Sequence, residues 1–273
     1  TSDLSIIYLM KLLPYFLLIL AFSLFSCQEV VELELETTGP QLVVDATLTS
    51  TPVQNQVILT RSGSYYEPGD YATVSDAVVE ISGSDGQSWL LTEAQPGVYT
   101  ADGLIGRVGE RYTLRVESEG QVVTGQSDLL APIVLDSLSF EPLTGQGPGL
   151  MSDFLMRAHF DDPAGEQVYL RFLVAVNDTL DRGIYLYNGG LLGNEDGLAP
   201  FPTLALQAGD QVTVTALRID RAVYDYFLQL AEVAGLGFGP ASAAPANPES
   251  NLSGEVLGYF GATSATQLAA QVP

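Results

Sequence analysis

Short apolar runs recur along the first half of this chain at intervals that suit β-strands. Gly, Pro, Asp and Ser cluster between the runs, as expected where strands end in turns. About seven strands in roughly 90 residues, with turns about every 8 to 12 residues, are typical of an immunoglobulin-like β-sandwich. The runs are residues 41–48, 57–59, 78–81, 88–91, 97–99, 111–117 and 121–124.

Two local signals refine this prediction. The pair Asp85-Gly86 lies between the third and fourth runs, where a tight reversal needs positive φ angles, so we expect a hairpin there. The sixth run alternates apolar and polar residues cleanly. This alternation predicts that Tyr112, Leu114 and Val116 face the core.

A second β region follows Leu130-Ala131-Pro132, where proline removes a strand donor and marks a domain boundary. Residues 188–209 are rich in Gly, Pro and acidic residues, which predicts a long loop. The strand candidates of this region are residues 133–140, 154–160, 167–176, 183–187 and 211–219.

One helix is predicted, over residues 221–234. Asp220 can cap its start and Gly235 its end. Residues 235–250, rich in Gly, Ala and Pro, should form a loop, and residues 251–262 should return a last strand to the second sheet. The apolar residues that would face a sheet are Val223, Phe227, Leu230 and Ala234.

Residues 10–28 have the features of a lipoprotein signal peptide. The apolar run 12–25 is shorter than the roughly 20 residues that a membrane-spanning helix needs. Residues 24–27 resemble a bacterial lipobox, so we expect cleavage before Cys27 and acyl chains, palmitate among them, on this cysteine. The alternatives are a plain secretory signal or a short interfacial helix. Residues 1–9 are expected to precede the natural start at Met10.

Acidic residues follow this cysteine directly. Gln28 and Glu29 open a stretch that resembles the export signal of surface lipoproteins, which predicts an outward-facing location on the outer membrane. These signals divide the chain into four segments. They are the upstream residues and signal peptide (1–27), an acidic tether (28–39), an immunoglobulin-like β-sandwich (40–131) and a second β domain (132–273) with the helix 221–234 and the loop 235–250.

The chain carries 33 acidic and 10 basic residues, a formal net charge of -23. A surface this negative repels phosphate backbones, so nucleic acid is excluded as an expected partner. Cys27 is the only cysteine, and an intrachain disulfide is therefore impossible.

The residue inventory argues against catalysis. His159 is the only histidine, and Cys27 is not a free thiol once acylated, so no catalytic residue and no cofactor are predicted. His159 is interpreted as an exposed strand histidine, with a metal or acid–base role as the alternative. Asp161, Asp162 and Glu166 are weak candidates for structural calcium, against an ordinary solvated turn. A paired-carboxylate glycosidase stays open, because partners can come from distant loops.

The loop 61–71 carries three tyrosines. Tyr65, Tyr66 and Tyr71 combine apolar area with a hydroxyl group, which suits a surface that recognises a partner or ligand. The alternative is that these rings pack back over the open end of the sandwich.

The order of these landmarks resembles a family of Bacteroidota outer-membrane lipoproteins that carries a domain of unknown function, DUF4249-like. The order of residues 77–81, 97–99 and 112–114 resembles the transthyretin-like or carboxypeptidase-regulatory-like variants of the sandwich. The family resemblance implies association with TonB-dependent receptors, with no established activity and no catalytic residues to transfer. The segments that carry it are the lipobox at Cys27 and residues 32–35, 40–45, 74–81, 97–99, 221–230, 251–252 and 258–262.

We therefore expect a mostly β protein, with an N-terminal immunoglobulin-like or transthyretin-like β-sandwich and a second β-sandwich-like domain that has one α-helix near its C-terminus. The expected function is that of a lipid-anchored, non-catalytic binding or accessory subunit of a TonB-dependent nutrient transporter. Its partners would be the outer membrane and a receptor barrel. A structural or adhesive surface lipoprotein is the alternative, and a surface hydrolase is a third.

Overall fold

The described part of the chain lies entirely within one unit, residues 39–273. The computed structural model describes residues 39–52, 55–63, 71–143, 152–163, 166–192, 196–235 and 247–273. The chain is mostly β with one long helix near its C-terminus, as predicted.

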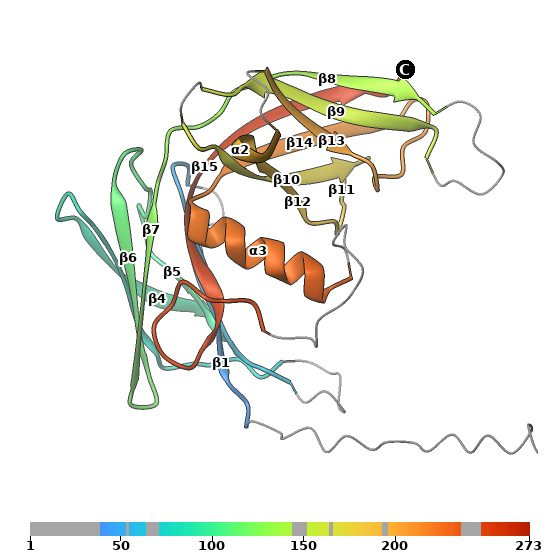
Figure 1. The fold of residues 1–273 in the computed structure, drawn as a ribbon. Helices are drawn as coiled ribbons and strands as arrows, with labels where there is room; N and C mark the ends of the chain where they lie inside the picture. The colour runs from blue at the N-terminus through green and yellow to red at the C-terminus, as the bar shows by residue number, and fades with distance from the viewer. Residues whose placement is uncertain are drawn as a thin grey trace, which may run out of the picture. The chain divides into compact units, whose positions relative to one another are not determined.

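The first seven strands surround one hydrophobic core (Figure 1). Strands β3 and β4 form the predicted hairpin, and Gly86 in its turn has a φ of 84°. Tyr112, Leu114 and Val116 of β6 are fully buried, which confirms the orientation predicted from alternation. The strands are β1 Leu42–Thr49, β2 Gln56–Arg61, β3 Val78–Gly83, β4 Ser88–Gln95, β5 Val98–Thr100, β6 Arg111–Ser118 and β7 Gln121–Asp128.

The elements from β8 to β14 form a second group around a second hydrophobic core. Strands β13, β9 and β8 form a three-stranded sheet, and their buried side chains pack with those of β10, β12 and β14. Phe172 lies at the centre, with its ring 5.3 Å from Phe201 and 6.2 Å from Phe160. The elements are β8 Leu135–Pro142, β9 Phe154–Asp161, β10 Tyr169–Val176, β11 Thr179–Leu180, β12 Tyr185–Asn188, α2 Gly189–Leu192, β13 Asp196–Phe201 and β14 Gln211–Arg218.

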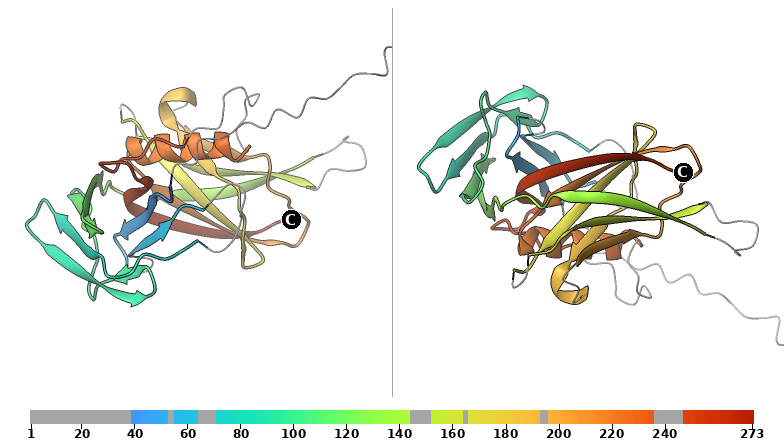
Figure 2. Two further views of the ribbon diagram at one scale, coloured as in Figure 1. Left: turned by 90° about the horizontal axis from the view of Figure 1, so that it is seen from below. Right: turned by 90° about the horizontal axis from the view of Figure 1, so that it is seen from above.

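The last strand, β15 Leu257–Gln271, belongs to both groups of strands. Its first half pairs in parallel with β1 and its second half pairs antiparallel with β14, and Figure 2 shows this red strand running from one group into the other. The expectation that residues 251–262 return a last strand to the second sheet is therefore wrong, because residues 257–262 pair with β1, and only the continuation of the strand from Ser264 pairs with β14. Phe260 and Ala262 contribute to the first core. The domain division at residue 131 stays a prediction.

The pairing of β15 with β1 depends on a glycine. Gly258 has a φ of 99°, and a Cβ at this position would lie 1.9 Å from the carbonyl oxygen of Val44. Only glycine allows this close approach of the two backbones.

Helix α3, Arg221–Val233, confirms the predicted helix and its ends. Asp220 is the N-cap, and Gly235 adopts a φ of 72° just after the C-cap residue Ala234. Val223 and Phe227 are buried as predicted, but Ala231 rather than Ala234 completes the buried face. Within the described residues, no helix is long and apolar enough to cross a bilayer.

Candidate functional site

The outer face of β1 carries polar side chains in the middle of a large sheet. Successive side chains of a strand point to opposite faces, so Val43, Asp45 and Thr47 point away from the first core. The parallel register places Tyr259 of β15 opposite Asp45. This face therefore combines a carboxylate, a hydroxyl and an aromatic ring.

Helix α3 and strand β10 supply the facing wall. Tyr226, Phe227 and Leu230 of α3 and Arg171 of β10 complete a cavity of about 420 Å³. This volume lies within the range of about 300–1,000 Å³ that is typical of small-molecule sites. The remaining lining residues are Val43, Asp45, Thr47, Gln56, Gly258 and Tyr259.

Aromatic side chains fix the shape of this wall. The Tyr259 ring lies 5.1 Å from Tyr226 and 4.8 Å from Phe227, measured between ring centroids. The Arg171 guanidinium carbon lies 3.8 Å from the centre of the Phe227 ring, a cation–π contact. These contacts hold the cationic group in one position beside the cavity.

The two charged groups of the cavity are incompletely neutralised. The Asp45 side chain is accessible from the cavity, yet protein atoms surround it closely enough that burial raises the pKa of its carboxylate; a hydrogen bond from Tyr259 and the charge of Arg171 partly oppose this. Burial and the nearby Asp45 charge raise the pKa of Tyr259 to about 12. In the part of the chain that the structure describes, the Arg171 guanidinium makes no ion pair or hydrogen bond.

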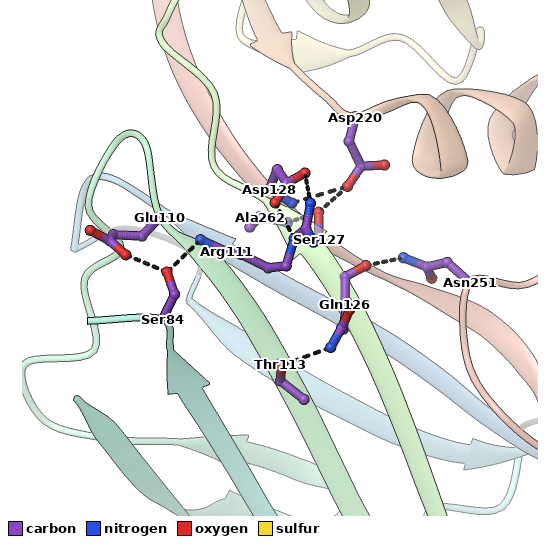
Figure 3. A network of polar contacts seen from close by, with 10 residues as sticks. All are labelled: Ser84, Glu110, Arg111, Thr113, Gln126, Ser127, Asp128, Asp220, Asn251 and Ala262. Atoms are coloured by element: carbon purple, nitrogen blue, oxygen red, sulfur yellow. Dashed lines mark hydrogen bonds and ion pairs between the residues drawn. The ribbon is translucent and has the colours of Figure 1, made fainter. Parts of the chain in front are cut away.

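A polar network holds the start of α3 against the first group of strands (Figure 3). One carboxylate oxygen of Asp220 accepts a hydrogen bond from the Val223 amide at 2.9 Å, which caps the helix. The other accepts from the Ser127 hydroxyl at 2.5 Å and from the Asp128 amide at 3.3 Å. Ser127 in turn accepts from the Ala262 amide at 2.8 Å. Asp220 therefore joins α3 to β7 and, through Ser127, to β15.

The same network continues across the surface of the first group of strands. Arg111 binds Asp128 through two hydrogen bonds of 2.6 and 2.9 Å, and its backbone amide donates to Ser84 (Figure 3). The Asn251 amide group donates to the Gln126 carbonyl at 3.2 Å. These contacts fix β7, the strand to which Asp220 attaches the helix.

A second cavity, of about 270 Å³, lies beside Asn55 and Leu104. The Asn55 amide group donates to the carbonyl oxygens of Leu104 at 2.6 Å and Thr51 at 2.7 Å, and its oxygen accepts from the Thr49 amide. The polar groups of Asn55 are thus used by the fold itself. The cavity at Asp45 and Arg171 is therefore the stronger candidate site.

Most residues of the sequence-predicted sites fall outside the described residues. Cys27, Gln28, Glu29, Tyr65 and Tyr66 are in this group, so the lipidation, export and tyrosine-surface assignments stay predictions. Tyr71 is described. Its side chain is 65% exposed, and its role in recognition stays a prediction.

The acidic turn and the histidine are held by ordinary structural contacts. Asp162 accepts a hydrogen bond from the Tyr187 hydroxyl at 2.8 Å, and Glu166 pairs with buried Arg218 at 2.7 Å. Among the described residues, no group of three or more His, Cys, Asp or Glu side chains could hold a metal ion, so Asp161, Asp162 and Glu166 do not form one. His159 is half-buried rather than exposed, and its ring lies 2.7 Å from the Ser139 hydroxyl.

Sequence reasoning missed the residues of the cavity. Asp45 interrupts an apolar strand, a weak signal that many exposed positions share. Arg171, Tyr226 and Tyr259 lie in three other elements, and nothing local marks them as neighbours of Asp45.

Comparisons with known proteins identify a family. The family described as a domain of unknown function (DUF4249) matches residues 28–269, which confirms that part of the resemblance inferred from the motifs. A search of curated proteins finds no match. Among solved structures, the FN1–FN3 domains of chicken CNTN1 match over 67% of this chain with 10% sequence identity and a TM-score of 0.26. The match spans 60% of that structure's length.

Proposed function

The chain belongs to the DUF4249 family, and we propose that it is a non-catalytic, lipid-anchored binding protein of the outer membrane that serves a TonB-dependent nutrient transporter. The observation that carries the binding role is the cavity between α3 and the β1–β15 face. It brings a carboxylate, a guanidinium, hydroxyl groups and apolar side chains together in one concave site. A few convergent polar groups in a partly apolar cavity are typical of ligand recognition.

The proposed location derives from the sequence. The apolar run before Cys27 and the lipobox favour acylation of this cysteine, and the acidic residues from Glu29 onward favour export to the outer face. Several acyl chains would hold the protein stably at the membrane, whereas one chain gives only marginal binding. The folded part of the chain would then lie outside the cell beside the transporter.

Purification from outer membranes tests this function. The last residue, Pro273, is exposed, so a tag on a short linker can be attached there. We expect a large β-barrel to copurify in mild detergent with the wild-type chain. The control is Cys27→Ala, which should lose the acyl label, leave the membrane fraction and bring down no barrel.

The absence of any barrel with the acylated wild-type chain would contradict the transporter role. It would favour instead a structural or adhesive lipoprotein that works without a transporter.

A further inference from the structure

The cavity contains one anionic and one cationic side chain that are not ion-paired with each other. No ion pair within 4.0 Å joins Asp45 to Arg171, although both line the same 420 Å³ space. We propose that this cavity binds a small zwitterion, an amino acid or a very short peptide, whose ammonium group contacts Asp45 and whose carboxylate contacts Arg171. This inference rests on the proposed binding function and specifies its ligand.

Asp45 suits an ammonium group. Its carboxylate is reached from the cavity but crowded by protein atoms, so its pKa is raised by burial. Asp45 is an exposed residue of β1, and a carboxylate that protein atoms surround only in part is stabilised by an opposite charge that also donates hydrogen bonds. The Tyr259 hydroxyl already donates to it, and an ammonium group would supply further donors together with a positive charge beyond that of Arg171.

Arg171 suits a carboxylate. Its guanidinium carbon lies 3.8 Å from the centre of the Phe227 ring, and its side-chain N–H donors make no hydrogen bond to any described residue. A planar guanidinium binds a carboxylate through two parallel hydrogen bonds. The chain as a whole carries a charge of -23, so a carboxylate would be repelled at most of its surface and needs a local cation such as this one.

The rest of the lining favours an apolar side chain over a sugar ring. Val43, Leu230 and Phe227 supply apolar surface. The face of Phe227 is covered by Arg171, and Tyr259 packs between Phe227 and Tyr226. Rings that pack on one another and on Arg171 offer less free face for stacking on a carbohydrate. A zwitterion with an apolar side chain uses both charges and the apolar wall.

The test is calorimetric titration of the purified chain in mild detergent. The probes are free amino acids and dipeptides with apolar side chains, the same compounds with an acetylated amine or an amidated carboxylate, and a set of neutral sugars. We expect binding of at least one free zwitterion and at least tenfold weaker binding when either end is blocked. Equal binding of the blocked compounds, binding of a sugar instead, or no binding of any zwitterion would overturn the assignment.

Matched variants test whether the zwitterion binds in this cavity. Asp45→Asn and Arg171→Gln should each weaken binding at least tenfold, whereas the exposed controls Asp136→Asn and Arg182→Gln should leave it unchanged. Circular dichroism and melting curves check that all four variants fold, and unchanged binding in folded Asp45→Asn would contradict the inference.

The transporter role and the ligand assignment can be refuted independently of each other. A barrel that copurifies with a chain that binds no zwitterion refutes only the ligand assignment. A zwitterion that binds a chain without a barrel partner refutes only the transporter role.

Discussion

Asp45 keeps a carboxylate where the surrounding protein atoms disfavour its charge. Burial is the main reason that its pKa is raised in the folded chain. A carboxyl group with a higher pKa in the folded than in the unfolded state stabilises folding when it is protonated. Its ionisation therefore lowers stability as the pH rises above the unfolded value of about 3.9 and through the raised folded value. A residue that reduces stability at neutral pH is expected where a ligand contact needs the charge.

This loss of stability on ionisation leads to a prediction for Asp45→Asn. The variant should have a higher melting temperature than the wild type at pH 7, because the amide carries no charge to desolvate. The difference should shrink as the pH falls through the raised folded value, and it should be smallest below about 3.9, where the wild-type carboxyl is mostly protonated in both states. Thermal melts of both proteins between pH 3.5 and 8 measure this. A variant that is less stable at pH 7 would show that Asp45 is a structural residue.

At the scale of elements, the capping residue of α3 also attaches the helix to the first group of strands. Asp220 accepts from Val223 within the helix and from Ser127 and Asp128 of the first group of strands. Because α3 provides one wall of the cavity, this residue connects helix stability to the geometry of the site.

Asp220→Ala should reduce the free energy of unfolding by about 0.5–2 kcal/mol, the range for loss of an N-cap, with the loss of the two strand contacts adding to it. The matched control is Asp225→Ala on the same helix. Asp225 makes only an exposed pair with Arg221 at 3.4 Å, which contributes about 0.3–0.5 kcal/mol. Denaturant unfolding of both variants measures the difference, and equal effects would refute the role given to Asp220.

Local sequence signals predicted these elements, whereas no local signal predicted which distant strands would pair. The alternation in β6 and the cap and stop residues of α3 lie within a few residues of what they determine. The error at Ala234 reflects the boundary, because that residue is already the exposed C-cap. The pairing of β15 with β1 joins residues more than 200 positions apart in the chain, for which the sequence contains no local pattern.

At the scale of the whole described unit, β15 connects the two cores. It contributes Phe260 to the first core and Leu268 to the edge of the second, and Asp220 adds a polar connection between α3 and β7. The cavity lies where these connections bring β1, β10, α3 and β15 together. Together with Gln56 of β2, five separate elements make the site, so only the three-dimensional arrangement could reveal it.

The central claim is that ligand recognition takes place in this cavity. Amide hydrogen exchange, measured with and without a saturating amount of the tightest-binding compound, tests it most directly. We predict slower exchange in residues 43–47, 226–230 and 257–259, with little change in β8, β9 and β13. Protection confined to those three strands or to the segment around Tyr71, with none at residues 43–47 or 226–230, would contradict the claim.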